Sequence, residues 1–169
     1  PKTSVNEYWG GNLSWIQSSD LNEHQVSDIS AKKKITETGL KNSASKLVPA
    51  NSIAVVTRVG VGKLAFMPFE YATSQDFLSL SKLKVDEWFG VYSLYKKLQS
   101  ELHAVQGTSI KGITKEVLLS KNIMVPVDID EQFTIGSFFK NIDTLITLHQ
   151  RKLNHLQEQK KALLQQMFV

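Results

Sequence analysis

The C-terminal stretch, residues 130–167, constrains the fold more than any other part of the sequence. Pro126 precedes it, Asp128 or Asp130 can supply an N-cap, and Asp128 with Glu131 has the spacing of a capping box. No proline interrupts the stretch. A helix over these residues would be roughly 55 Å long at 1.5 Å per residue. That length exceeds the diameter of a small domain, so the rest of the chain cannot cover all of it.

One side of this predicted helix is apolar at alternating steps of three and four residues, which is the pattern of a heptad seam. We predict that another helix, from a second copy or another protein, covers the seam. The alternative is a long helix that lies across its own domain. The seam consists of seven apolar and two polar positions: Phe139, Ile142, Ile146, His149, Leu153, Leu156, Lys160, Leu163 and Met167.

The net charge of +4 belongs to the part of the chain before the helix. Residues 1–127 contain 15 Lys and Arg against 11 Asp and Glu, whereas residues 128–169 contain five of each. We therefore expect two units, a basic domain over 1–127 and a balanced helix over 128–169. A modest positive excess is compatible with a polyanionic partner.

Compartment and covalent chemistry follow from what the sequence lacks. It has no cysteine, which excludes disulfides and cysteine-based zinc sites. No apolar run approaches the length of a membrane span, and no signal peptide is visible. We expect an intracellular protein that has no membrane partner.

The domain is predicted to be β-rich. Residues 52–59 and 63–67 are strands joined by Gly60-Val61-Gly62, residues 13–17 and 122–125 are shorter strands, and residues 71–80 are one further strand. Gly10-Gly11-Asn12 is typical of a turn, and residues 43–47 could form one helical turn. With the long helix, the fold class is α+β.

Two further helices are predicted in the domain, over residues 85–104 and over residues 115–119, where Thr114 is the cap. The first is amphipathic, and its aromatic stripe favours a core face over a binding platform. That stripe consists of Trp88, Phe89, Tyr92, Tyr95, Leu98 and Leu102.

Residues 60–65 match the G-x-G-x-x-A pattern of dinucleotide sites. That pattern binds a cofactor only where a helix starts at the glycines. Here the β-prone residues 63–67 and Pro68 favour a glycine-hinged hairpin instead. We predict no cofactor, and a hairpin that brings Arg58 and Lys63 to one tight loop.

Catalytic motifs are missing from the sequence. None of the four histidines, His24, His103, His149 and His155, is at metal-ligand spacing from another. There is no nucleophile elbow, no H-E-x-x-H and no paired carboxylates in an apolar setting. A basic β-rich domain followed by a helical rod is suited to recognition and assembly, and we predict a chain without catalytic activity or bound metal.

Four sequence blocks, in order, resemble the DNA-specificity subunit of type I restriction-modification systems, or one half of it. Residues 8–16 are similar to an opening W-G-G-x-x-P-W-I, with Ser14 at the usual proline. Residues 57–63 are similar to an R-x-x-x-G-K loop, and residues 73–77 to T-N-Q-x-F, with Ser74 in place of asparagine. Residues 107–113 are similar to a G-S-T block, followed by I-P-x-P and E-Q blocks at 123–126 and 131–132.

The resemblance implies a target-recognition domain over 1–127 and one conserved spacer or dimerisation helix over 128–169. Two such units, with antiparallel helices, would read the two halves of a split double-stranded DNA target. The partners implied are adenine methyltransferase subunits, restriction subunits, and a second copy or second half-subunit. The implied location is the cytoplasm of a bacterium or archaeon. The alternatives are a stand-alone methyltransferase or nuclease fragment, and an oligomerisation module with incidental basic charge.

Residue type and loop position select candidate DNA contacts within these blocks. Side chains with paired donors or acceptors read base edges, whereas lysines and hydroxyls hold phosphates. For base edges we predict Arg58, Gln75, Gln106 and Ser109. For phosphates we predict Lys32, Lys33, Lys34, Lys63, Thr108 and Lys111.

Overall fold

The computed structural model describes residues 1–104 and 112–168, and its central strand is β4 (Ser52–Val56). All five residues of β4 are buried because both of its faces are covered. Ala54 and Val56 pack toward a second sheet. Ile53 and Val55 pack toward helix α2 (Glu87–Ala104). A strand covered on both faces has no polar alternation, which explains the run of β-branched residues in its sequence.

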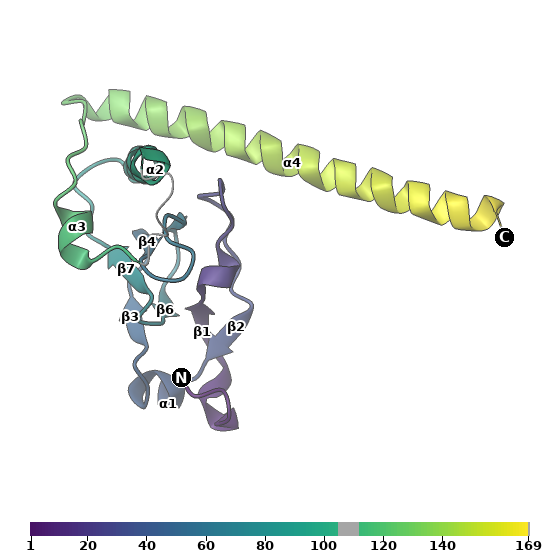
Figure 1. Ribbon diagram of the computed structural model, residues 1–169, viewed down its shortest axis with the longest axis horizontal. Helices are drawn as coiled ribbons and strands as arrows, with labels where there is room; N and C mark the ends of the chain where they lie inside the picture. The colour runs from purple at the N-terminus through teal and green to yellow at the C-terminus, as the bar shows by residue number, and fades with distance from the viewer. Residues whose placement is uncertain (105–111, 169) are drawn as a thin grey trace.

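Two small sheets pack on each other (Figure 1). In the three-stranded sheet, β4 lies between β5 (Leu64–Met67) and β7 (Phe77–Leu80), both antiparallel to it. The four-stranded sheet has the order β2 (Lys33–Ile35), β1 (Trp9–Ile16), β6 (Tyr71–Thr73) and β3 (Lys46–Val48). Only β1 and β6 run parallel. The remaining short elements are 3-10 turns at Asn6–Tyr8 and Ser18–Asp20 and helices α1 (Glu37–Lys41) and α3 (Lys115–Leu119).

Tyr71 joins the two sheets through a buried polar contact. Its hydroxyl lies 3.1 Å from Ser52 Oγ on β4 and 3.1 Å from Ser79 Oγ on β7. Both serines therefore satisfy a phenol that is completely buried. The burial raises the pKa of Tyr71, so the side chain remains a neutral donor.

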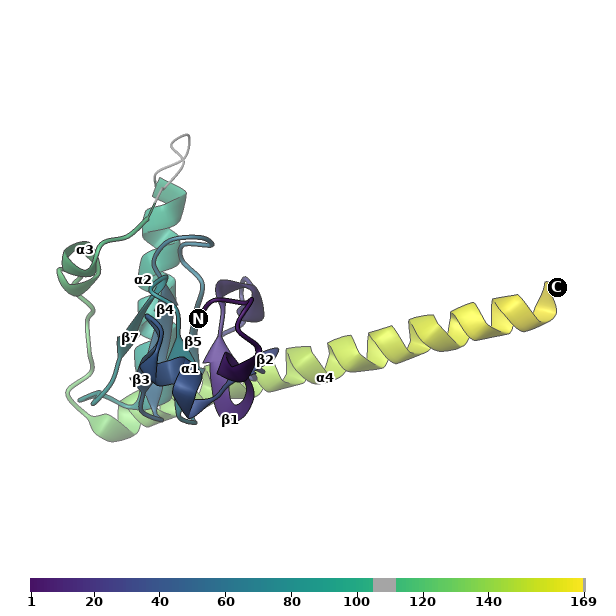
Figure 2. The ribbon, with the colours of Figure 1, turned by 90° about the horizontal axis from the view of Figure 1, so that it is seen from below.

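Helix α4 (Ile129–Met167) leaves the domain as a rod (Figures 1 and 2). Its 39 residues span about 59 Å at 1.5 Å per residue. Of the two predicted N-cap candidates, Asp128 is the one used, and its carboxylate accepts the Asp130 N–H at 2.9 Å. The base of the rod packs on the domain, mainly against α2. The α+β prediction with a long terminal helix is confirmed, and the distal part does not lie across its own domain.

Several local predictions are wrong. Residues 43–47 form no helical turn, because Lys46–Val48 pair with β6 as strand β3. Residues 71–80 are not one strand, because the turn at 74–76 sends β6 and β7 into different sheets. Residues 122–125 form no strand in the described structure.

The double glycine at residues 10 and 11 forms a bulge instead of a turn. Trp9 and Leu13 both pair with Ile35, so the intervening residues are extra on one strand. Gly10 has a φ of +79°, and a Cβ on Gly11 would overlap the Ile35 carbonyl. The bulge keeps β1 continuous from Trp9 to Ile16.

Candidate functional site

Thr57 joins three segments at one end of the domain. It follows β4 and begins the loop to β5, which carries Arg58 and Lys63. Its backbone N–H and its hydroxyl both donate to the Asp76 carbonyl, at 2.8 and 2.9 Å. Its own carbonyl accepts the Ile113 N–H at 2.8 Å. The loop, the 74–76 turn and the segment after residue 111 are thus held together.

Arg58 and Gln75 are both exposed on these joined segments. They come from separate sequence blocks, and the Thr57–Asp76 bonds bring the two blocks side by side. A guanidinium and a carboxamide can each make bidentate hydrogen bonds to a base edge. The arrangement therefore places two side chains that can form bidentate hydrogen bonds on adjacent loops.

The glycines of the β4–β5 hairpin support this loop, and the predicted hairpin is confirmed. Gly60 and Gly62 have φ values of +86° and +94°, which other residues rarely adopt. The Gly62 carbonyl accepts Gln99 Nε2 at 3.4 Å, and a Cβ on Gly62 would overlap the Leu102 side chain. The glycines thus serve a tight turn that packs against α2, and no helix starts at them.

The lysine triplet lies at the edge strand β2 and near the same end of the four-stranded sheet. Trp15 pairs with Lys33, and Ile16 pairs with Thr73. Lys32, just before β2, and the 74–76 turn, just after β6, therefore lie at the same end of the strands. The ends of β2 and β6 are two strand spacings apart, about 10 Å.

The three lysines are not equivalent. Lys32 Nζ donates to the Ser19 carbonyl at 3.0 Å and lies 3.9 Å from a carboxylate oxygen of the fully buried Asp20 side chain. Lys33 Nζ lies 5.3 Å from the centre of a Trp9 ring. Lys34 is exposed opposite Ser14. Lys32 therefore contributes to the fold, whereas Lys33 and Lys34 are the triplet members that are free of that role.

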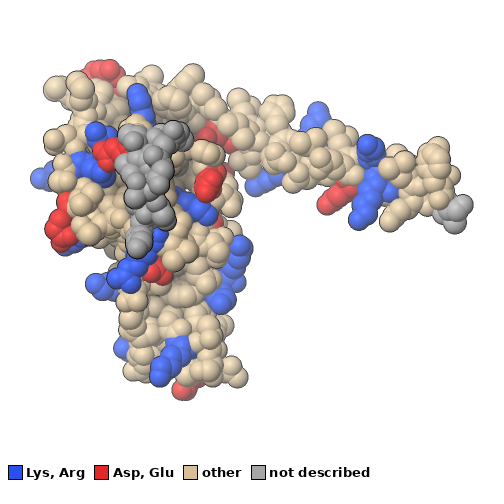
Figure 3. All heavy atoms as spheres, in the orientation of Figure 1, with Lys and Arg blue, Asp and Glu red and all other residues tan. Residues whose placement is uncertain are grey.

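Of the other predicted contacts, Lys63 is half-buried beside Gly60, and its carbonyl accepts the Val56 N–H at 2.9 Å. Four predicted residues, Gln106, Thr108, Ser109 and Lys111, lie outside the described residues. The described residues on either side of them are attached to the Thr57 loop, through Gln99 and Ile113. In the view of Figure 3, Lys and Arg side chains are scattered over the domain, with Asp and Glu side chains among them.

The base of α4 is attached to α2 through Gln132, which is only 5% exposed. Gln132 Oε1 accepts the Asp86 N–H at 3.0 Å, and Gln132 Nε2 donates to the Pro126 carbonyl at 2.7 Å. Asp86 in turn caps α2 by accepting the Phe89 N–H at 2.8 Å. One amide side chain therefore links the start of α2 to the segment that enters α4.

Gly136, one turn later, allows the two helices to touch. A Cβ at this position would lie 2.6 Å from the Phe89 nitrogen and 2.9 Å from Trp88 Cβ. Sequence reasoning missed this contact and the role of Gln132. A glycine inside a helix was the available signal, because it costs about 1 kcal/mol relative to alanine unless packing requires it.

Two polar contacts complete this joint, which consists of Gln132, Gly136, Lys140 and Asp143 on α4. Asp143 accepts the Tyr92 hydroxyl hydrogen at 2.7 Å, and Lys140 Nζ lies 4.4 Å from the centre of the Trp88 ring. Burial, and then the Asp143 carboxylate, raise the pKa of Tyr92, so the phenol remains a donor. After Asp143 the rod leaves the domain.

The predicted seam occupies a different face of α4. Each residue turns an α-helix by about 100°, so Leu153 lies roughly 100° around the axis from Gly136. Phe139 is partly covered by Tyr92, with ring centres 5.5 Å apart, and Ile142 is half-buried. The other seam positions are exposed: Ile146, His149, Leu153, Leu156, Lys160, Leu163 and Met167.

Within the described ranges, no group of His, Cys, Asp or Glu residues could hold a metal ion. Nor does any described helix have the length and apolar character needed to cross a membrane.

Comparison with known proteins gives one consistent family. Residues 1–158 match the family model described as type I restriction modification DNA specificity domain. The chain is 30% identical over 168 residues to the MjaIX specificity subunit of Methanocaldococcus jannaschii, which covers 94% of this chain and 37% of that protein. It is also 30% identical over 153 residues to the EcoR124I/EcoR124II specificity subunit of Escherichia coli, covering 86% of this chain and 37% of that one.

Solved structures show the same fold. The HsdS subunit from Thermoanaerobacter tengcongensis aligns with a TM-score of 0.60 at 15% identity, over 90% of this chain and 35% of that one. A structure of a type I R-M system aligns with a TM-score of 0.66 at 16% identity, over 96% of this chain and 39% of that one. The chain thus spans a little over a third of the length of the relatives it matches.

Proposed function

Because the chain belongs to the family of type I restriction modification DNA specificity domains, we propose that it reads one half of a bipartite DNA target and docks adenine methyltransferase and restriction subunits. It would do so without catalysing a reaction itself. The observation that carries the proposal is the pair of hydrogen bonds from Thr57 to the Asp76 carbonyl. These bonds hold the Arg58 and Gln75 loops side by side at one end of the domain.

The two units would have different roles. Residues 1–127 would hold the DNA, and residues 128–169 would provide assembly. The exposed seam on α4 supports pairing with a second copy or a second half-subunit, because an apolar stripe of this length needs a partner helix in water. Nothing in the described part of the chain favours a stand-alone methyltransferase or nuclease.

Base reading is tested by Arg58→Ala and Gln75→Ala. The target is first selected from a random duplex pool with the assembled complex, and affinity is then measured for the target and for each single base-pair substitution. Each variant should lose discrimination at its own position by about 1–3 kcal/mol, or roughly 5- to 150-fold. Gln165→Ala, on the far part of α4, is the control. Unchanged discrimination in both variants would contradict the assignment.

Phosphate binding by the triplet is tested with Lys33→Gln/Lys34→Gln, leaving Lys32 in place beside Asp20. We expect weaker binding to all sequences alike. The slope of log affinity against log salt should flatten by about 0.9 for each phosphate that the variant no longer neutralises. The matched control is Lys82→Gln/Lys84→Gln, which follows β7 at the opposite end of its sheet. Equal slopes in parent and triplet variant would remove these lysines from the DNA interface.

A further inference from the structure

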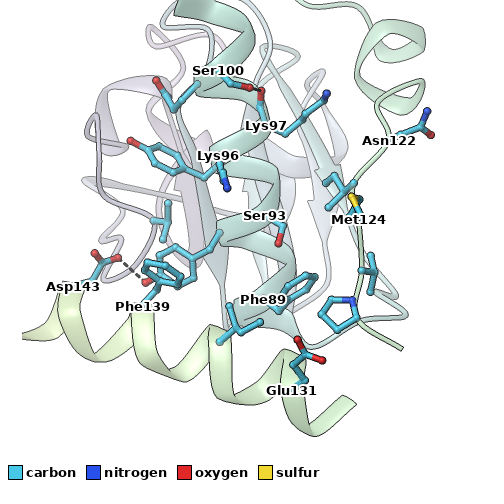
Figure 4. Close-up of a pocket in the computed structure, with 18 of the residues that line it drawn as sticks. Phe89, Ser93, Lys96, Lys97, Ser100, Asn122, Met124, Glu131, Phe139 and Asp143 are labelled. Atoms are coloured by element: carbon cyan, nitrogen blue, oxygen red, sulfur yellow. Dashed lines mark hydrogen bonds between the residues drawn. The ribbon is translucent and has the colours of Figure 1, made fainter. Parts of the chain in front are cut away.

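Asp76 is an acidic residue at the end of the domain that carries the candidate DNA contacts. Other aspartates have structural partners. Asp86 caps α2, and Asp143 accepts the Tyr92 hydroxyl hydrogen in a groove of about 990 Å³ between α2 and the base of α4 (Figure 4). Asp76 lies instead on the 74–76 turn, where its carbonyl accepts both hydrogen bonds from Thr57.

The carboxylate of Asp76 is oriented by a neighbouring residue and keeps unused acceptor capacity. Ser74 Oγ donates to Asp76 Oδ2 at 3.1 Å and accepts the Asp76 N–H at 3.3 Å. Among the described residues, no Lys or Arg forms an ion pair with Asp76. Its Oδ1 has no donor in the described part of the chain, and this oxygen is accessible to solvent. The turn therefore carries an acceptor that no described group of the protein uses.

Exposed lysines flank the 74–76 turn on both sides. Lys46, on the edge strand β3, pairs with Thr73 directly before the turn. Lys33 lies on the opposite edge strand, β2. The two edge strands are three strand spacings apart, roughly 14 Å, and a DNA major groove is about 12 Å wide. If the lysines hold phosphates on either side of the groove, the turn between them faces base edges. Sequence reasoning selected neither Lys46 nor Asp76.

A carboxylate between two phosphate contacts has few favourable partners on DNA. It only accepts hydrogen bonds, and the phosphates repel it. The donors on base edges in the major groove are the amino groups at cytosine N4 and adenine N6. The adenine amino group lies beside the N7 acceptor, which repels a carboxylate, whereas cytosine presents no acceptor beside its amino group. This chemistry favours cytosine.

We propose that Asp76 is a specificity-determining residue, which accepts a hydrogen bond from the N4 amino group of a cytosine in the half-target, and that Ser74 positions its carboxylate. The inference rests on the proposed function, because it requires this end of the domain to face DNA. It adds to that function the identity of one base and the acidic residue that reads it.

Asp76→Asn tests the assignment, because asparagine keeps the size of the side chain and an oxygen for the Ser74 hydroxyl. Affinity is measured with the assembled complex on the selected target and on its single base-pair substitutions. The parent should prefer cytosine at one position by about 5- to 150-fold. The variant should lose that preference or shift it to adenine, since a carboxamide can bond both N6 and N7 of adenine. It should also bind unrelated duplex roughly two- to fivefold more tightly at low salt, because a negative charge near the phosphates is gone.

Two further variants separate reading from charge and from folding. Glu70→Gln removes the same charge from an exposed side chain at the other end of β6, and should leave every base preference unchanged. Ser74→Ala keeps the carboxylate but no longer orients it, so the cytosine preference should weaken without tighter binding to unrelated duplex. Thr57 binds the main-chain carbonyl of Asp76, so the variants at positions 74 and 76 retain that contact. Circular dichroism verifies the fold of each variant.

The outcomes distinguish this inference from the proposed function. A parent complex that selects no DNA sequence would overturn both. A parent complex that selects a sequence, with every base preference retained in Asp76→Asn, would overturn the assignment of Asp76 alone. So would a preference lost at an A·T pair, or an equal loss of preference in Glu70→Gln.

Discussion

If the chain pairs through α4 as proposed, Leu153→Asp should convert the dimer into a monomer that keeps its fold. Leu153 is 47% exposed in the single chain, so its replacement removes little from the domain itself. In the proposed pairing, however, Leu153 is buried in the seam of both copies, so each dimer loses two buried leucines. Burial of a leucine contributes about 1.5–3 kcal/mol, so the loss is roughly 3–6 kcal/mol and the dissociation constant should rise by about 10² to 10⁴.

Sedimentation equilibrium over a range of concentrations measures this change. The control is Asn154→Asp, which adds the same charge at the neighbouring position about 100° around the helix. That variant also keeps an oxygen to accept the Gln150 hydrogen bond, which spans 2.9 Å. A parent protein that stays monomeric at tens of micromolar, or a Leu153→Asp variant that dimerises as the parent does, would contradict the pairing.

Gly136→Leu should separate α4 from α2 and destabilise the chain. Even the first carbon of a side chain would lie 2.6 Å from the Phe89 nitrogen, which is backbone and cannot rotate away. Overpacking of this kind costs about 1–3 kcal/mol. The displaced helix would also withdraw Gln132 from the start of α2, where it accepts the Asp86 N–H.

Urea unfolding in a Leu153→Asp background measures the free energy of unfolding of the monomer, without coupled dissociation of a dimer. Asn141→Leu, which adds similar bulk at an exposed position of the same helix, is the matched control and should change stability little. Gly136→Ala tests the sign of the change in the free energy of unfolding. In an open helix, alanine would stabilise by up to about 1 kcal/mol, and a gain of that size would show that α2 does not restrict this position.

The elements that can be predicted from the sequence carry their signals locally. The helix at residues 115–119 is predicted with its boundaries, because Thr114 is an N-cap that accepts the Val117 N–H. The long helix is predictable from its cap, its apolar period and its lack of proline. The β4–β5 hairpin follows from the β-branched run before Gly60 and Gly62 and the short apolar run after them.

The failures occur where a distant contact decides the local structure. Residues 71–80 have the composition of a single strand, but Thr57 binds the Asp76 carbonyl and fixes a turn in the middle. Residues 46–48 become a strand because β6 offers an edge. Neither contact is visible in a sequence pattern of a few residues.

The candidate site also combines features that the local sequence predicts with features that depend on distant contacts. Residue type is sufficient to select Arg58, Gln75 and the lysine triplet, and their contacts with DNA stay predictions. Residue type cannot distinguish Lys32, which is placed against Asp20, from Lys33 and Lys34. The joint between α2 and α4 depends on two helices that are far apart in the sequence, so the roles of Gln132 and Gly136 emerge only from the structure.

The hydrogen bonds of Thr57 have a consequence for how the proposed DNA specificity could be changed. On the partner side they use only main-chain atoms, the Asp76 carbonyl and the Ile113 N–H. The neighbouring positions 58 and 75 can therefore change in identity while the loops keep their places. A library randomised at those two positions, with threonine retained at 57, should yield correctly folded variants with new base preferences.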